Sequence, residues 1–412
     1  MVKYSVQIPA DSPPAITYGS MKKPHFNPRV AALSPPPIPA IQQWAHSYDG
    51  CCGPLIDLSQ AVPGYAPHPR LLAALASAAG SARYAGYGPI EGEDEMRAAY
   101  ARHLNETYGG KVSASEVHIT SGCNQAFAAA VMALIGPGES VLLLNPFYFN
   151  HQTTLAMLGI GTVTVDCHAA QGFVPKVADI AAALNPAVRA VVLISPNNPT
   201  GAVYPPELLQ AIHALCCDRG LWLLLDETYR DFLPLSSTAA PHRLFSQTKW
   251  QNNLVALYSF SKSFCIPGHR LGALTASAAV VAQVAKVMDN LQICAARAPQ
   301  AAVAKGLSDL VEWREANRRE ISNRADTFRQ TMAAAPAWRL DALGAYFAYV
   351  KHPFSGQSSE QVAHRLATQA GVLTVPGVYF GENQQQHLRM AFANADSATI
   401  TQLSERLNRL TD

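Results

Sequence analysis

The chain has 412 residues, which is longer than one simple core requires and favours two domains, or one large domain with a smaller companion. Its 31 Lys and Arg residues nearly balance its 29 Asp and Glu residues, and a net charge of +2 excludes the broad basic field that attracts nucleic acid or anionic membranes. The eight cysteines lack metal-type spacing, the N-terminus lacks an apolar leader and no apolar run reaches membrane-spanning length, so the sequence predicts a cytoplasmic protein with reduced thiols, no metal site and no membrane partner.

The first segment, residues 1–28, is rich in Pro, Ser and Lys and has neither a helical nor a strand period. This composition predicts an arm that is either disordered or held by a partner subunit. The prolines that follow can begin a helix but cannot continue one, so a short helix is expected from Ile38 onward.

Residues from about 93 to 300 alternate between helical and strand-like patterns, which indicates a parallel sheet with crossover helices. Continuous apolar runs predict strands buried on both faces, at 141–144, 190–194 and 221–225. Helices are expected between them, at 125–135, 175–184 and 205–219. Because active sites in such sheets collect at the carboxyl ends of the strands, the residues that follow each strand are the candidates for chemistry.

The pattern changes after about residue 300. A smaller α+β domain is predicted there, with a long charged helix at 309–332, an apolar run at 344–350, a helix at 358–369, a strand at 388–392 and a terminal helix at 397–410.

One lysine, Lys262, lies among hydroxyl groups directly after the strand-like run 254–258. A lone lysine usually covers apolar surface with its stem, but Ser259, Ser261 and Arg270 offer the hydroxyls and the planar cation that bind a phosphate ester. A lysine amine can also form a Schiff base with pyridoxal phosphate. The stretch therefore provides groups for both ends of one cofactor, pyridoxal 5'-phosphate.

The Ser-x-Ser-Lys pattern with an arginine eight residues later resembles the cofactor-lysine motif of the class I and II aminotransferases. Further motifs resemble those of the same family and follow the family's order from about residue 56 to 392. The resemblance implies a fold type I enzyme with a large domain, 66–300, built on a doubly wound, mostly parallel α/β sheet. It also implies a small α+β domain made from both chain ends, 29–65 and 301–412.

The turn after the strand at 117–119 carries Gly122, Cys123 and Asn124 and opens an apolar helix. A helix start binds anions because its unpaired N–H groups and its dipole point at whatever lies there. A plain tight turn is the alternative interpretation. In the resembled family this turn holds the cofactor phosphate, commonly with a hydroxyl where Cys123 stands here.

Three other strand ends match the family's cofactor site. Tyr148 matches the family's aromatic ring that stacks on the pyridine ring of the cofactor. Asn198, in the loop 195–201, matches the asparagine that hydrogen-bonds the 3' oxygen of the cofactor and lies beside the substrate. Asp226 ends an apolar strand, where an unpaired buried charge would be costly, and it matches the family carboxylate that pairs with the protonated pyridine nitrogen. An N-cap aspartate is the alternative interpretation. Tyr229 matches the tyrosine that donates to the 3' oxygen, and with Asp226 and Lys262 completes the predicted catalytic set.

Tyr87 matches the family tyrosine that reaches the phosphate of the neighbouring subunit, with Tyr84 as a near competitor. If this match holds, the active sites are built across the interface of an obligatory homodimer.

Substrate contacts are predicted on the small-domain side. Arg389 interrupts an apolar run and resembles the arginine that clamps the substrate carboxylate through its planar fork. Ala61 stands where the family has a glycine whose backbone approaches the same carboxylate, and an ordinary strand end is the alternative there. His269, beside Arg270, is interpreted first as a packed histidine and second as a substrate contact.

Together these matches imply a transaminase that moves an amino group between an L-amino acid and a 2-oxo acid. The same residues serve carbon-sulfur β-lyases, decarboxylases and cyclases, which share the carbanionic chemistry. A non-catalytic ligand sensor is a further alternative, against which the intact Lys262, Asp226 and Arg389 count.

Overall fold

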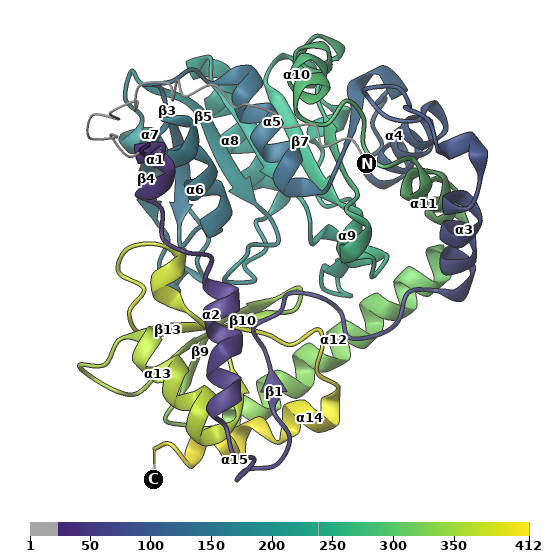
Figure 1. Ribbon diagram of the computed structural model, residues 1–412. Coiled ribbons are helices and arrows are strands. Elements are labelled where there is room, and N and C mark those ends of the chain that lie inside the picture. Colours follow the sequence, from purple (N-terminus) through teal and green to yellow (C-terminus); the bar gives the residue numbers. More distant parts are fainter. Residues whose placement is uncertain (1–23, 238, 412) are drawn as a thin grey trace, which may run out of the picture.

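The computed structural model describes residues 24–237 and 239–411, so most of the predicted N-terminal arm lies outside the described residues. The chain forms two parts that lie one above the other in Figure 1, and the long helix α12 (Val311–Ala333) runs between them.

The larger part is built on a seven-stranded sheet in the order β2-β8-β7-β6-β5-β3-β4. Neighbouring strands from β7 to β4 are parallel, whereas β8 is antiparallel to both of its neighbours. The strands are β2 (Val117–Thr120), β3 (Ser140–Asn145), β4 (Gly161–Asp166), β5 (Val188–Ile194), β6 (Trp222–Asp226), β7 (Leu254–Ser259) and β8 (Gly272–Thr275). The predicted mostly parallel sheet is confirmed.

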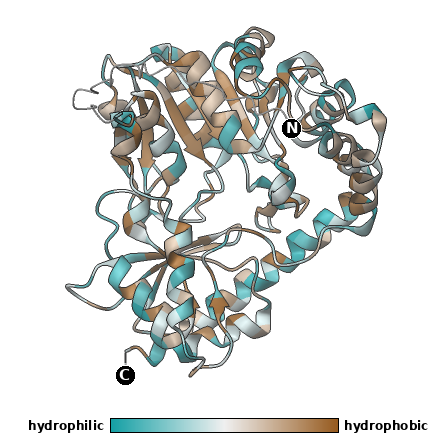
Figure 2. Ribbon diagram, viewed as in Figure 1, coloured by the Kyte–Doolittle hydropathy of each residue, from teal (hydrophilic) through white to brown (hydrophobic). Residues whose placement is uncertain are grey.

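Helices cover both faces of this sheet. Successive residues of a strand point to opposite faces, so strands that are apolar throughout make both faces of the sheet apolar. Val141 and Leu143 of β3 pack with α5, α6 and α10, while Leu142 and Leu144 pack with the helices of the other face. In Figure 2 the strands are accordingly brown between helices that carry teal residues. The helices are α5 (Cys123–Leu134), α6 (Phe149–Leu158) and α10 (Ala278–Leu291) on the first face, and α3 (Pro69–Ala79), α4 (Asp94–Tyr108), α7 (Val177–Ala183), α8 (Pro206–Arg219) and α11 (Arg297–Asp309) on the second.

The smaller part contains a four-stranded antiparallel sheet in the order β12-β13-β10-β9. A separate pair joins β1 parallel to β11, which brings an early segment of the chain beside a late one. The strands are β1 (Ile56–Asp57), β9 (Arg339–Gly344), β10 (Phe347–Lys351), β11 (Val372–Leu373), β12 (Val375–Pro376) and β13 (His387–Ala391), and the helices are α2 (Pro37–Trp44), α13 (Ser359–Arg365), α14 (Ser397–Thr401) and α15 (Leu403–Asn408). The short helix α1 (Pro28–Ala31) instead lies against α6 of the larger part (Figure 1).

Two of the predicted helices differ from the structure. The helix expected at 358–369 is α-helical to Arg365 and ends in a π turn, Leu366–Ala370. The terminal helix is divided into α14 and α15, and Thr401 beside the break donates from Oγ1 to the Ser397 carbonyl at 2.8 Å. Such back-bonding to the preceding turn bends helices.

The predicted domain limits stay predictions. Helix α11 runs through the expected boundary at residue 300 and packs against α3 and α4 of the larger part. Among residues 24–237 and 239–411, no helix combines the length and apolar character that crossing a bilayer requires.

Candidate active site

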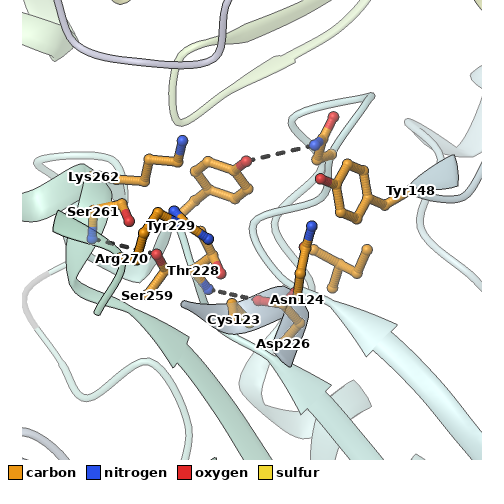
Figure 3. A pocket seen from close by; sticks show the side chains of 12 residues that line it. Cys123, Asn124, Tyr148, Asp226, Thr228, Tyr229, Ser259, Ser261, Lys262 and Arg270 are labelled. Carbon is orange, nitrogen blue, oxygen red and sulfur yellow. Dashed lines mark hydrogen bonds between the residues drawn. The ribbon is translucent and has the colours of Figure 1, made fainter. Parts of the chain in front are cut away.

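A pocket lies where β5, β6 and β7 end (Figure 3). These strand ends are on the side of the sheet that faces the smaller part (Figure 1). The pocket brings together most of the residues that the sequence singled out, although they come from six separate segments. The lining residues are Cys123, Asn124, Tyr148, Ile194, Asn198, Asp226, Thr228, Tyr229, Ser259, Ser261, Lys262 and Arg270. Gly122, Tyr87, Ala61 and Arg389 are the predicted residues that do not line it.

One end of the pocket is suited to a phosphate. Gly122 has a φ of 85° and precedes the first residue of the twelve-residue helix α5, so the free N–H groups of that helix open toward the pocket. A Cβ atom on Gly122 would collide with the Arg270 guanidinium, which donates to the Ser121 carbonyl at 3.4 Å. The buried Ser261 Oγ has no hydrogen-bond partner among the described residues. A bound phosphate would satisfy this hydroxyl beside the arginine and the helix start.

Lys262 reaches the pocket from the four-residue helix α9 (Phe260–Ser263) at the end of β7 (Figure 3). The Ser259 hydroxyl caps α9 by accepting from the Ser261 N–H at 3.3 Å. Burial first, and then the nearby positive charges of Arg270 and Arg389, together lower the pKa of Lys262 from 10.5 to about 8. The amine is therefore partly neutral near physiological pH and available as a nucleophile or base.

Asp226, the last residue of β6, places a buried carboxylate at the opposite wall. Its Oδ1 accepts from the Thr228 N–H at 2.9 Å, and burial raises its pKa above the ordinary aspartate value. Its Oδ2 lies 3.6 Å from Nε2 of His151, whose own pKa burial lowers to about 3. Because a neutral histidine cannot balance the charge, the carboxylate is suited to a cationic N–H from a ligand.

Tyr229 and Tyr148 lie on different sides of the pocket (Figure 3), which Asn198 also lines. The Asn198 amide donates to the Tyr229 hydroxyl at 3.5 Å, and Tyr148 is held by the Asn150 amide, which donates to its hydroxyl at 2.8 Å. Burial raises the pKa of Tyr229, so its hydroxyl stays protonated and can donate.

Arg389 lies directly behind this pocket, on β13 of the smaller part. Its Nη1 donates to Asn198 Oδ1 at 3.1 Å, which places the guanidinium next to the pocket although it does not line it. Its Nη2 donates to the Ser59 carbonyl, and its buried Nε has no partner among the described residues. The guanidinium lies between the rings of Phe347 and Phe380, 5.5 and 5.4 Å from their centroids.

The remaining predicted residues lie around the pocket. Ala61 is half-buried, and its carbonyl accepts from the Tyr346 hydroxyl at 3.2 Å. Tyr87 is 79% exposed and does not line the pocket of its own chain, whereas the Tyr84 ring centroid lies 5.4 Å from each of the Arg83 and Arg297 guanidinium groups.

The prediction that His269 is packed in the protein interior is wrong for the single subunit. This residue is exposed, because it ends the short 3-10 turn Pro267–His269 at the surface.

Sequence reasoning missed three residues of the site. Thr228 follows Asp226 by two positions, the usual spacing for an aspartate that accepts from the backbone ahead of it, and this signal could have found it. Ile194 ends an apolar strand and carries no signal of its own. His151, on α6, lies beside Asp226 and stacks on Phe127 of α5, with ring centroids 3.9 Å apart, a contact between separate segments that no local motif signals.

A family model described as aminotransferase class I and II matches residues 53–407 of this chain. The chain belongs to the class I and II aminotransferases. An arginine–pyruvate transaminase of Pseudomonas aeruginosa is 30% identical over 313 residues, which cover 74% of this chain and 77% of the relative. An aspartate/prephenate aminotransferase of Thermus thermophilus is 27% identical over 387 residues, which cover 93% and 97%. The solved structure of an aspartate aminotransferase from Thermus thermophilus with maleate has a TM-score of 0.86 at 25% identity, covering 94% of this chain and all of that one.

This aminotransferase therefore has the fold and the reaction type that the motifs predicted, in preference to the lyase, decarboxylase, cyclase and sensor alternatives. Members of the family exchange amino groups between amino and keto acids, generally use pyridoxal phosphate and are commonly dimeric.

Proposed function

We propose that this aminotransferase binds pyridoxal 5'-phosphate in the pocket described above and uses it to transfer the amino group of an L-amino acid to a 2-oxo acid. The observation that carries the proposal is the separation of charges in one pocket. A lysine amine of lowered pKa and an arginine lie at one side, and a buried carboxylate without a cationic partner among the described residues lies at the other.

The residues at the α5 end would hold the phosphate group. Gly122, Cys123 and Asn124 offer backbone N–H groups at the start of α5, while Ser259 and Ser261 offer hydroxyls and Arg270 a guanidinium. Burial is the main cause that raises the pKa of the Cys123 thiol, so this thiol stays neutral beside the negatively charged phosphate. This explains how a cysteine is tolerated where the family commonly has a hydroxyl.

The opposite end would hold the ring. Asp226 would pair with the protonated ring nitrogen, Tyr148 would lie against the ring face, and Asn198 and Tyr229 would donate to its 3' oxygen. The protonated ring then serves as an electron sink for the bonds to the substrate Cα.

Substrate orientation and proton transfer fall to Arg389 and Lys262. Arg389 offers a planar fork to the substrate carboxylate, and Asn198 and Ala61 lie beside that position. The Lys262 amine would accept the proton that leaves the substrate Cα and hold it for its return. A pKa near 8 suits both directions of this transfer.

The homodimer belongs to the same proposal. Tyr87 is too exposed to serve its own pocket, whereas Tyr84 is held under two arginines of its own chain. Both facts favour Tyr87 as the residue that reaches the phosphate bound by a second copy of the chain.

The decisive experiment is an absorbance spectrum of the cofactor-loaded protein before and after addition of single amino acids without any oxo acid. Stoichiometric conversion of the yellow band to the band of the amino form identifies amino transfer and names the donors. A band that persists while pyruvate, ammonia or carbon dioxide accumulates contradicts the proposal.

A further inference from the structure

The helix that carries Lys262 cannot hold its own orientation. Helix α9 has four residues, and isolated helices of fewer than about 12 residues are marginal in water. Directly after it, Cys265 has a φ of 56°, a left-handed conformation that non-glycine residues adopt at some cost. The direction of the Lys262 side chain therefore depends on contacts from outside α9.

One such contact comes from Tyr258, a fully buried residue of β7. Its Oη lies 2.6 Å from Oδ2 of Asp231 and 2.8 Å from Oγ of Ser263. A phenol has a single proton, and the carboxylate can only accept, so the Tyr258 hydroxyl donates to Asp231 and the Ser263 hydroxyl donates to Tyr258. Ser263 is the neighbour of Lys262, so this chain of two hydrogen bonds ends at α9.

The other end of the chain is held by buried cations. The Arg314 Nη1 lies 3.4 Å from Oδ1 of Asp231, and its guanidinium lies 5.3 Å from the ring centroid of Phe264. The Arg230 guanidinium lies 4.0 Å from the ring centroid of Tyr258. The ring of Tyr258 and the Asp231 carboxylate that accepts its hydrogen bond are thus both held in place.

These contacts connect two segments that the proposed chemistry needs in register. Asp231 belongs to the loop that begins with Asp226 and contains Tyr229, while Tyr258 and Ser263 flank Lys262. The strands that carry them, β6 and β7, are parallel neighbours. The Tyr258 hydroxyl therefore connects the segment that carries Asp226 to the segment that carries Lys262, without lining the pocket itself.

We propose that the hydroxyl of Tyr258 is a positioning group that, through Ser263 and Asp231, holds Lys262 in the pocket. This inference rests on the role proposed for Lys262 and adds a residue that does not touch the cofactor. The alternative is that the hydroxyl contributes only to the stability of the core, as a buried hydrogen bond does anywhere.

The test is the variant Tyr258→Phe, which removes the hydroxyl and keeps the ring beneath Arg230. In the cofactor-free protein, the pH dependence of Lys262 acetylation, followed by peptide mass spectrometry, reports the apparent pKa of this amine. Burial has the largest effect on this value, and the charged or titratable groups that also influence it are Arg270, Arg389 and the thiols of Cys123 and Cys265. Loss of the contact lets the amine leave its buried position, so its pKa should rise from about 8 toward the ordinary 10.5.

In the cofactor-loaded protein the same variant should lower kcat roughly five- to tenfold, the equivalent of one buried hydrogen bond, and leave the KM of the amino donor unchanged. Tyr108→Phe is the matched control. Tyr108 is equally buried in this cluster and donates to Glu227 at 2.5 Å, but it has no hydrogen bond to α9. Removal of the Tyr108 hydroxyl should leave the pKa of Lys262 unchanged.

Two outcomes overturn the inference. One is a Tyr258→Phe protein with a lower unfolding midpoint but the wild-type Lys262 pKa and kcat, and the other is an equal pKa rise in both tyrosine variants. If Tyr258→Phe does not fold, Ser263→Ala breaks the same chain at its other hydrogen bond and must give the same pKa rise. Failure of the proposed function is distinguishable, because the wild-type protein would then neither bind the cofactor nor turn over, whereas the acetylation of cofactor-free protein still reports the positioning.

Discussion

The Nε2 atom of His151 lies 3.6 Å from Oδ2 of Asp226, and the imidazole is stacked on Phe127. Burial lowers the pKa of His151 to about 3, so the ring is neutral at physiological pH and leaves the negative charge of Asp226 for another partner. The variant Asp226→Asn keeps the shape of the side chain and removes its charge. It should lower kcat on the order of 10²- to 10³-fold, the usual effect of removing one preorganised electrostatic group, measured in steady-state assays with saturating cofactor.

Asp166→Asn is the control for that variant. Asp166 ends β4 at the same edge of the sheet and accepts from the Asn145 amide at 2.6 Å, but it does not line the pocket. A comparable loss in both variants would show that the charge of Asp226 has no special part in the reaction.

Gly122→Ala should weaken cofactor binding beyond its effect on stability. The added Cβ costs about 1 kcal/mol at this positive φ and also displaces the Arg270 guanidinium from the phosphate end. Gly138→Ala is matched to it, because Gly138 has a φ of 86° and no atom within 4 Å of the added Cβ. Both variants should lose similar unfolding free energy, measured on cofactor-free protein. Only Gly122→Ala should raise the dissociation constant of pyridoxal phosphate, and equal constants would remove Arg270 and this turn from the phosphate site.

Arg389→Lys keeps the charge and loses the planar fork. A charged hydrogen bond contributes about 1.5–3 kcal/mol, so kcat/KM for α-amino acids should fall roughly 10- to 100-fold, mostly through KM. Amines that lack a carboxylate should react at an unchanged rate. The control is Arg406→Lys, an equally buried arginine that donates to the Ala370 and Gly371 carbonyls, away from the pocket. Equal sensitivity of amines and amino acids to Arg389→Lys would refute its role as a carboxylate clamp.

The lowered pKa of Lys262 also predicts how stability depends on pH. In the folded, cofactor-free protein this amine titrates at about 8, below its ordinary value of 10.5, so between these pH values the unfolded chain binds more protons than the folded one. Stability should therefore rise with pH across this window. Lys262→Met lacks this contribution, so it should be more stable than the wild type at pH 7, and the difference should shrink toward pH 10.5. Urea unfolding at several pH values measures it, and a constant difference would mean that the amine is not buried in the folded state.

The sequence predicts those parts of the site that depend on short stretches. Lys262, Asp226 and Asn198 each follow a strand whose apolar run is unmistakable, and parallel strands bring their carboxyl ends to one edge. Contacts between distant segments could not be predicted in this way. Arg389 reaches Asn198 across 191 residues because the smaller part docks on that edge, and the Tyr258–Asp231 bond depends on how the chain turns after β6 to bring Asp231 back to β7. The exposure of His269 likewise follows from a local turn that no periodicity reveals.

The last prediction concerns the second subunit. If Tyr87 contacts the phosphate bound by the partner subunit, a Tyr87→Phe chain keeps its own Lys262 but weakens phosphate binding in the pocket of its partner. A Lys262→Ala chain lacks the amine in its own pocket but still supplies Tyr87 to its partner. In a mixed dimer of the two, the pocket with Lys262 receives its tyrosine from the Lys262→Ala chain and is complete. Unfolding and refolding an equal mixture should therefore recover about a quarter of the wild-type activity at a low pyridoxal phosphate concentration, since half of the dimers are mixed and each has one complete site. Each variant refolded alone is the control. Activity that never exceeds the sum of the two controls would show that Tyr87 acts within its own chain or not at all, and repeating the mixture with Tyr84→Phe decides between the two tyrosines.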